Sequence, residues 1–165
     1  MAIVKLRGKI RLRASIASLK VLNNKQKHAI ITVGIPGSGK TTWAEQQQNY
    51  VNLNLDDFRE KISGNAADQN INKLAVEMRD AFLKRAIKKQ QNIILSDTNI
   101  NPFFRERLID QLKTAGYSIE LKVFDIALEE ALKRNANRSR NVPEEVIIRM
   151  YNQLKDQNIH GSSNK

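Results

Sequence analysis

The feature that most constrains this chain is a glycine-rich segment, Gly34–Thr42, which directly follows the apolar run Ala29–Val33. Its spacing, Gly-x-x-x-x-Gly-Lys-Thr, is that of a phosphate-binding P-loop. Glycines at these positions adopt backbone angles that side chains disfavour, so the main-chain N–H groups can surround an anion. Good helix formers follow Lys40, which completes the strand–loop–helix order that the motif requires. The segment predicts an ATP or GTP site.

The spacing of this segment predicts a separate role for each of two residues. Lys40 is expected to reach the β- and γ-phosphates, and Thr41 to offer its hydroxyl to the Mg²⁺ that bridges them. The alternative is a tight glycine turn with a coincidental lysine. The residues of the segment that we expect to bind ATP are Gly34, Pro36, Gly37, Ser38, Gly39, Lys40, Thr41 and Thr42.

Four short segments predict a parallel β-sheet. Ala29–Val33 and Asn92–Leu95 are nearly continuous apolar runs, as expected of central strands that are covered on both faces. Val51–Leu55 and Ile119–Val123 alternate between apolar and polar residues, as half-exposed edge strands do. Helical patterns separate the strands, so the connections are crossovers. We expect an α/β fold with a four-stranded parallel sheet in the order 2-3-1-4, flanked by helices.

The helices are expected at positions set by apolar periodicity and by helix-end signals. A short helix is predicted over residues 57–62 and a long amphipathic helix over about 70–89. A third is expected to begin at Pro102 and end near Gly116, because proline favours a first turn and glycine follows a last one. The last two are predicted over about 128–137 and from Pro143 onward.

Carboxylates follow two of the predicted strands at the edge where a ligand is expected. In an open parallel sheet the ligand lies beyond the carboxyl ends of the strands. Asp97 there is placed to hold Mg²⁺, directly or through a water, or alternatively to form a turn or cap. One of Asp56 and Asp57 is expected to cap the short helix, and the other to accept a proton from an attacking hydroxyl. Arg59, one turn on, would orient a substrate phosphate or Asp97.

A basic stretch near the C-terminus predicts a lid over the phosphates. Residues 133–143 carry four positive charges and no acid, and Arg134 and Arg138 are four residues apart, so on a helix they share one face. Arginines in such a lid stabilise the negative charge of phosphoryl transfer. The alternative is a solvated basic helix face.

The charge of +11 is concentrated at the N-terminus. Residues 1–28 contain eight Lys or Arg and no acid, and basic residues alternate with apolar ones at strand period from Lys5 to Arg13. Three interpretations are open: an arm that contacts phosphates, an added edge strand or cover, and a targeting segment. We divide the chain into a basic extension (1–28), one α/β domain (29–157) and a flexible tail (158–165). We expect no membrane association, because no apolar run reaches 18 residues.

Taken together, the segments resemble the phage-type 5′-polynucleotide kinases of the P-loop kinase superfamily. The resemblance covers about Ala29 to Leu154. The segments that carry it are Gly34–Ala44, Asn54–Arg59, Ser96–Pro102, Lys122–Asp125, Lys133–Asn135 with Arg138, Val142–Pro143 and Met150–Tyr151. Leu55 departs from the family pattern, which has a basic residue at that position.

The resemblance implies a kinase that transfers the γ-phosphate of ATP, or of another nucleoside triphosphate, to the 5′-hydroxyl end of DNA or RNA in end repair. It implies ATP and Mg²⁺ as cofactors, nucleic acid as partner, and a cytoplasmic location, in the host if the source is viral. It selects Asp56 as the general base and pairs Arg59 with Asp97. The implied residues are Lys40, Asp56 and Arg138 for catalysis; Arg134 and Arg138 for ATP; Asp56, Arg59, Asp97, Thr98 and Asn99 for substrate; and Thr41 and Asp97 for the metal.

Two other functions fit the same motifs. The first is a P-loop kinase for a small hydroxylated metabolite or nucleotide sugar, in which the donor half is unchanged and the acceptor differs. The second is a nucleotide-dependent nucleic-acid-binding module that transfers no phosphate. The joint presence of Lys40, Asp56 and the lid arginines argues against the second.

Overall fold

The structure is a computed structural model that describes residues 27–138, 141–157 and 159. The three interpretations of the basic N-terminal extension therefore concern a segment that lies, up to residue 26, outside the described residues. The same holds for most of the predicted tail. Among the described residues, none of the helices has the length and apolar character needed to cross a membrane.

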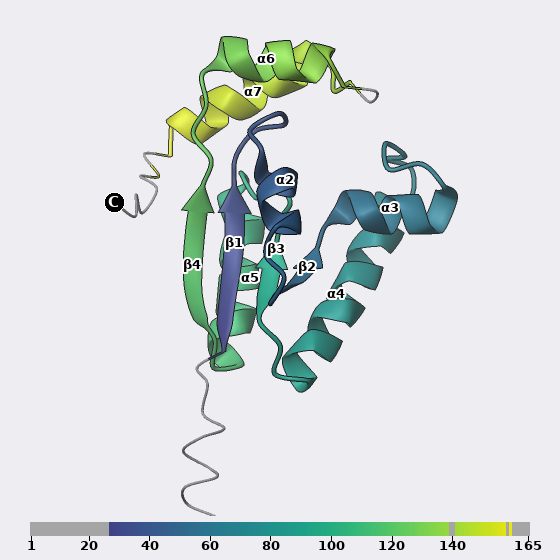
Figure 1. Ribbon diagram of the computed structural model, residues 1–165, viewed down its shortest axis with the longest axis vertical. Coiled ribbons are helices and arrows are strands. Elements are labelled where there is room, and N and C mark those ends of the chain that lie inside the picture. The colour runs from purple at the N-terminus through teal and green to yellow at the C-terminus, as the bar shows by residue number, and fades with distance from the viewer. Residues whose placement is uncertain (1–26, 139–140, 158, 160–165) are drawn as a thin grey trace, which may run out of the picture.

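Four parallel strands form one sheet in the order β2-β3-β1-β4 (Figure 1). They are β1 (His28–Val33), β2 (Val51–Leu53), β3 (Ile93–Leu95) and β4 (Ser118–Val123). This confirms the predicted order, with the two continuous apolar runs in the centre and the two alternating segments at the edges. The second strand ends two residues earlier than expected, because Asn54 already caps the next helix.

Helices connect the strands along the chain and also follow the last one. They are α2 (Lys40–Glu45), α3 (Leu55–Ser63), α4 (Asn72–Lys88), α5 (Pro102–Thr114), α6 (Leu128–Ala136) and α7 (Glu144–Lys155). Helix α3 begins two residues before its predicted start. The others agree with the sequence prediction to within one or two residues.

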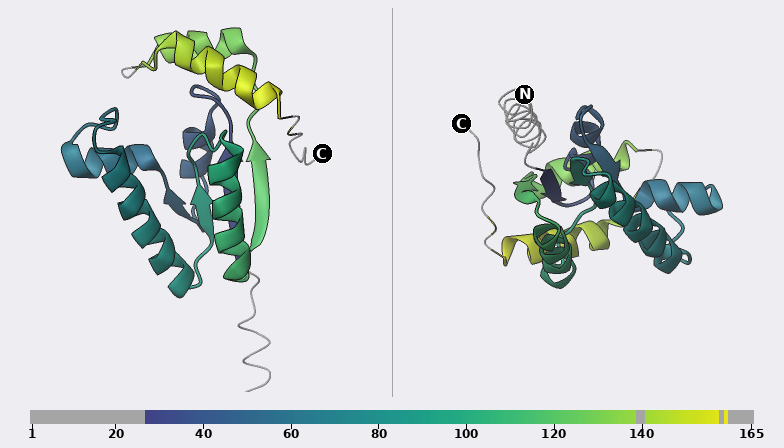
Figure 2. Two further views of the ribbon diagram at one scale, coloured as in Figure 1. Left: turned by 180° about the vertical axis from the view of Figure 1, so that it is seen from behind. Right: turned by 90° about the horizontal axis from the view of Figure 1, so that it is seen from below.

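Alternation along the strands sends side chains to two different layers of helices (Figure 2). Ala29, Ile31, Ile93 and Leu95 pack with α4 and α5, whereas Ile30 and Ile94 pack with Ala44 of α2 on the other face. Burial on both faces is what a central strand needs. The sheet is therefore covered by helices on both faces.

The remaining helices, α6 and α7, lie across the carboxyl ends of the strands, above the loop that follows β1 (Figure 1). They have an apolar core of their own, in which Ala131 and Ile147 pack with Val33 and Ile35. Because Ile35 belongs to the P-loop, the two helices are anchored directly on it. This arrangement places the basic lid residues over the phosphate-binding loop.

Candidate active site

The P-loop connects β1 to α2 and has the backbone geometry that the motif requires. Gly37 and Gly39 have positive φ angles of 83° and 94°. A Cβ atom on Gly37 would also lie 2.9 Å from the carbonyl oxygen of Ala131 in α6. Glycine is therefore needed at position 37 both for its backbone angle and for the close approach of the lid.

Lys40 is buried at the start of α2, with its Nζ close to the loop main chain. The ammonium group donates to the carbonyl oxygen of Ile35 at 2.8 Å and to Ser38 Oγ at 3.3 Å. Burial, followed by the nearby Arg138 guanidinium, lowers the pKa of Lys40 from 10.5 to about 8, while Asp97 and Asp56 act in the opposite direction. The fold thus brings Lys40, Arg138, Asp97 and Asp56 into one electrostatic cluster, as a transfer site requires.

The helix that carries Asp56 begins differently from the prediction. Neither Asp56 nor Asp57 is the N-cap, because Asn54 takes that position and its Oδ1 accepts the Asp56 N–H at 2.8 Å. Asn54 is an equally good cap one turn earlier, and its amide also donates to Ser96 Oγ at 3.1 Å. Both aspartates lie instead in the first turn of α3, where the helix dipole favours a negative charge.

Arg59 makes its ion pair with Asp56, and its positive charge also acts on the Asp97 carboxylate. The paired substrate-side role that the resemblance implies for Arg59 and Asp97 stays a prediction. The guanidinium of buried Arg59 makes an ion pair with Asp56 one helical turn before it. Its Nε donates to the carbonyl of Ala66 at 2.8 Å and its Nη1 to Asn72 Oδ1 at 2.7 Å.

Asp97 lies directly after β3 with its side chain 13% exposed, and it takes its partners from two other elements. Its Oδ1 accepts the Leu55 N–H at 2.7 Å, and its Oδ2 lies 3.6 Å from Arg79 Nη1 of α4. Oδ2 accepts no hydrogen bond within the described residues. Burial raises the pKa of Asp97 from 3.8 to about 6, against the opposing effects of the Leu55 N–H and Arg79.

The residues present fit the Mg²⁺ that a P-loop site uses. Mg²⁺ is held by one or two protein oxygens together with phosphates and waters, and needs no dense carboxylate cluster. Thr41 offers a partly exposed hydroxyl, and Asp97 Oδ2 is a carboxylate oxygen with no hydrogen-bond donor. In the described part of the chain, no group of three or more His, Cys, Asp or Glu could hold a metal by itself.

The loop after Asp97 is tied to the P-loop strand. The carbonyl of Thr98 accepts the Gly34 N–H at 3.1 Å. The amide of Asn99 donates to the carbonyls of Thr32 and Leu95 at 2.9 and 3.1 Å, and the residue has a positive φ of 45°. Asn99 therefore holds the Asp97 loop in place, and contact of Thr98 and Asn99 with a substrate stays a prediction.

The two lid arginines lie at the end of α6, Arg134 within the helix and Arg138 just beyond it. Arg134 is on α6, where Nε donates to Glu130 at 2.8 Å and Nη1 to the Gly37 carbonyl at 3.5 Å. Arg138 lies beyond Ala136, the last residue of α6. The helix ends there because the buried Asn135 side chain bonds the Val142 carbonyl and N–H at 2.8 and 2.9 Å.

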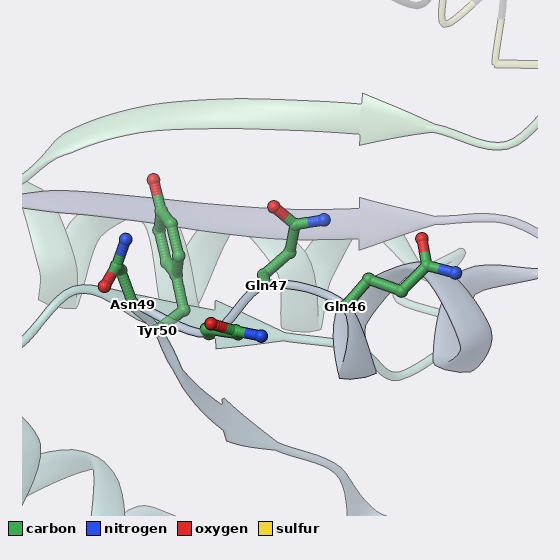
Figure 3. Close-up of a pocket in the computed structure, with 5 residues that line it drawn as sticks. Gln46, Gln47, Asn49 and Tyr50 are labelled. Atoms are coloured by element: carbon green, nitrogen blue, oxygen red, sulfur yellow. The ribbon is translucent and has the colours of Figure 1, made fainter.

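A shallow hollow lies at the other end of α2, away from Lys40 (Figure 3). It is lined by the polar side chains of Gln46, Gln47, Gln48, Asn49 and Tyr50. None of the residues predicted to bind ATP or substrate lines this hollow. It therefore has no part in the site described above.

The sequence did not predict a structural role for four residues that contact the site or its loops: Asn54, Asn72, Arg79 and Asn135. A signal existed for Arg79, because Ala75, Arg79, Leu83 and Ala86 are all buried on α4 and recur at helical spacing. A charged residue within an apolar stripe requires a buried partner. The other three are asparagines next to helix ends, which are too common to stand out.

The sequence of this chain matches a known protein family. Residues 30–156 match the model of the AAA domain family AAA_33. The chain belongs to this family of P-loop kinase domains. The match spans the P-loop, both carboxylate loops and the lid.

Individual relatives are more distant and longer. The chain is 30% identical over 155 residues to a protein of Autographa californica nuclear polyhedrosis virus assigned as a bifunctional polynucleotide kinase/RNA ligase, covering 78% of this chain and 22% of that protein. It is 26% identical to the L-seryl-tRNA(Sec) kinase of Methanococcus maripaludis, covering 74% and 50%. The chain thus spans half or less of the length of these relatives.

Among solved structures, the chain is similar to one from the Pnkp1/Rnl/Hen1 RNA repair complex. The TM-score is 0.62 with 27% sequence identity, and the alignment covers 81% of this chain and 46% of that chain. The four-stranded sheet and the P-loop of this chain are therefore those of a P-loop kinase domain.

Proposed function

We propose that the protein is a kinase that transfers the γ-phosphate of ATP, or of another nucleoside triphosphate, to the 5′-hydroxyl end of DNA or RNA. The observation that carries the proposal is the way in which three loops are joined at one edge of the sheet. The P-loop with buried Lys40 is bonded through Gly34 to the loop after Asp97, and Asp97 accepts the N–H of Leu55 at the start of the helix that carries Asp56. A cation at the phosphates, a half-exposed carboxylate beside them and a lid arginine are the parts of a phosphotransferase.

The proposed reaction uses the residues as follows. Asp56, whose carboxylate is half-exposed and held by Arg59, accepts the proton of the acceptor hydroxyl. A bond forms between that hydroxyl oxygen and the γ-phosphorus, and the bond to the β–γ bridging oxygen breaks, which releases the nucleoside diphosphate. Lys40 and Arg138 stabilise the negative charge of the transferred group. Thr41 and Asp97 would hold Mg²⁺, which neutralises phosphate charge when bound.

A polynucleotide acceptor is supported by three observations of different kinds. The viral relative is assigned as a polynucleotide kinase, and the similar solved chain comes from an RNA repair complex. The formal net charge of +11 favours association with phosphate backbones. We place this activity in nucleic-acid end repair in the cytoplasm, or the host cytoplasm if the source is viral. The domain division at residues 28 and 157 belongs to the same proposal.

The second candidate is a kinase for a small hydroxylated acceptor. The relative named L-seryl-tRNA(Sec) kinase favours it, because that name describes phosphorylation of an amino-acid hydroxyl rather than a strand end. In this alternative Lys40, Asp56 and the lid keep their tasks. The difference lies in what occupies the space next to Asp56.

A competition assay separates the two candidates. The protein is incubated with γ-labelled ATP and Mg²⁺ together with 5′-hydroxyl DNA and RNA oligonucleotides, seryl-tRNA, nucleotide sugars and simple sugars. The same oligonucleotides carrying a 5′-phosphate serve as the matched control. We expect label on the 5′-hydroxyl oligonucleotides and none on the control. Label confined to a small molecule or to the seryl group would contradict the proposal.

A further inference from the structure

Two polar side chains on one face of α4 contact residues that we assign to the acceptor site, Asn72 with Arg59 and Arg79 with Asp97. Asn72 and Arg79 are seven residues apart, which is two turns of an α-helix, so they lie on the same side. The apolar residues of that side, Ala75 and Leu83, are buried against the core. Both polar side chains therefore interrupt a face that otherwise packs like any core helix.

Arg79 is oriented toward Asp97 by its neighbour in the chain. Its Nε and Nη2 both donate to Asp80 Oδ1, at 3.0 and 2.8 Å. The remaining edge of the planar group, Nη1, then faces Asp97 Oδ2 at 3.6 Å. This is the carboxylate oxygen that accepts no hydrogen bond in the described residues. Asp80 thus fixes the guanidinium, and the guanidinium faces the oxygen.

Asn72 acts on the other carboxylate through one intermediate. Its Oδ1 accepts Arg59 Nη1 at 2.7 Å, and the Ala66 carbonyl accepts Arg59 Nε at 2.8 Å. The edge that remains, Nη2, pairs with Asp56. Two hydrogen bonds therefore fix the guanidinium of Arg59 in the position in which it pairs with Asp56, the proposed base.

Stability is a weak reason for the buried Arg79. Replacing both members of a buried ion pair by well-packed apolar residues is often neutral or stabilising, so a stable fold does not require the pair of Arg79 and Asp97. A function in the site accounts for an arginine there. Small displacements of a catalytic group cost large factors in rate, so a helix that fixes two carboxylates contributes directly to transfer.

We propose that Asn72 and Arg79 are positioning residues of the acceptor site, Arg79 by holding Asp97 and Asn72 by holding Arg59 against Asp56. The inference rests on the proposed phosphotransfer function and adds to it an element that supports the acceptor half. In this account α2 and the P-loop hold the donor, and α4 holds the carboxylates that face the acceptor.

The test uses matched substitutions on α4. Arg79→Gln and Asn72→Ala are compared with Arg85→Gln and Lys73→Ala, which are exposed residues on the same helix. Each variant is checked for an unchanged thermal unfolding midpoint and for ATP binding. The kcat and the KM values for ATP and for a 5′-hydroxyl oligonucleotide are then measured separately.

We expect Arg79→Gln and Asn72→Ala to lower kcat by about tenfold or more with the KM for ATP unchanged, and the two control variants to match the parent. Arg79→Lys should recover only part of the loss, because an ammonium cannot bridge Asp80 and Asp97 as a planar fork does. In the Asp97→Asn background, Arg79→Gln should cause no further loss, since its target is already gone.

Several outcomes would overturn the proposal. Equal rates for Arg79→Gln and Arg85→Gln would do so, as would an additive loss with Asp97→Asn. A parallel loss of ATP affinity and unfolding midpoint would assign Arg79 to the core alone. If the parent labels only a small acceptor, the polynucleotide function fails while the same variants, measured on that acceptor, still decide the positioning proposal. Transfer to no acceptor would overturn both.

Discussion

At the scale of single residues, the two carboxylates at the strand ends differ in a way that fits two tasks. Asp56 is half-exposed and paired with Arg59, while Asp97 is largely buried and faces Arg79. An exposed carboxylate next to Lys40 can meet an incoming hydroxyl. A buried one cannot, and is better suited to hold a metal or to orient its surroundings.

Asp56→Ala should lower the rate of phosphotransfer by on the order of 10² to 10⁴, the usual range for loss of a general base. Single-turnover transfer measured with excess enzyme reports this step without interference from product release. Asp57→Ala is the matched control, because Asp57 is an exposed neighbour in the same first turn. A loss confined to Asp57→Ala would mean that the wrong aspartate has been assigned.

Asp97→Asn should stabilise the nucleotide-free protein even though it impairs activity. The pKa of Asp97 is raised from 3.8 to about 6, so the folded state prefers the protonated form. The free energy of unfolding therefore falls as the pH rises from about 4 to 6, and the cost of the ionised carboxylate persists at neutral pH. This pKa shift corresponds to at most about 3 kcal/mol of lost free energy of unfolding at neutral pH.

Denaturant unfolding at several pH values checks this prediction. The parent protein should lose stability between about pH 4 and 6, and the asparagine variant should lose less and be more stable at pH 7. Asn retains an oxygen for the Leu55 N–H, so the hydrogen bond survives the change. A variant that is less stable at pH 7 would show that the ionised carboxylate is favourably solvated.

At the scale of elements, the start of α3 depends on one asparagine. Asn54→Ala should cost about 1 to 2 kcal/mol in unfolding free energy, because it removes the cap and the bond to Ser96. Asp57→Ala should cost much less, since it is not the cap. Chemical denaturation of the two variants side by side decides between them, and the reverse ranking would contradict the cap assignment.

The lid loop is closed by a second asparagine. Asn135→Ala removes both bonds to Val142 and should release the segment that carries Arg138. We expect a larger loss in kcat than in ATP affinity, because a lid arginine acts mainly on the transition state. Steady-state kinetics beside nucleotide binding measures the two effects. Loss of ATP affinity with an unchanged kcat would contradict this role.

The elements themselves could be predicted from the sequence because periodicity reports burial directly. The continuous apolar run at Asn92–Leu95 and the alternation at Ile119–Val123 predicted a central and an edge strand, and the structure has them at Ile93–Leu95 and Ser118–Val123. The side-chain partners could not be predicted. The pairing of Arg79 with Asp97 joins residues of two elements, and only the packing of α4 against the sheet brings them together.

Helix ends show the same limit. Asn54, Asp56 and Asp57 are all good caps, so the sequence alone does not rank them. Asn54 becomes the cap because Ser96 of the neighbouring strand end also binds it. The end of α6 at Ala136 agrees with the sequence prediction to within one residue, but the bonds from Asn135 across the following loop carry no sequence signal.

At the scale of the whole molecule, the fold divides the proposed reaction between two sets of elements. The P-loop, α2 and the anchored lid form a donor half, and α3, α4 and the loop after β3 form an acceptor half. The two meet at Lys40, where charges from both sides act on one ammonium group. Such a division suits a transferase, because donor and acceptor must approach along one line.

The central claim is tested most directly by single-turnover transfer. Excess protein is mixed with γ-labelled ATP, Mg²⁺ and a 5′-hydroxyl oligonucleotide, and the label on the strand is followed over time for the parent and for Asp56→Ala. The account predicts rapid labelling at the 5′ end by the parent and labelling slower by at least about 10² in the variant. An unlabelled strand, or equal labelling by both proteins, would contradict it.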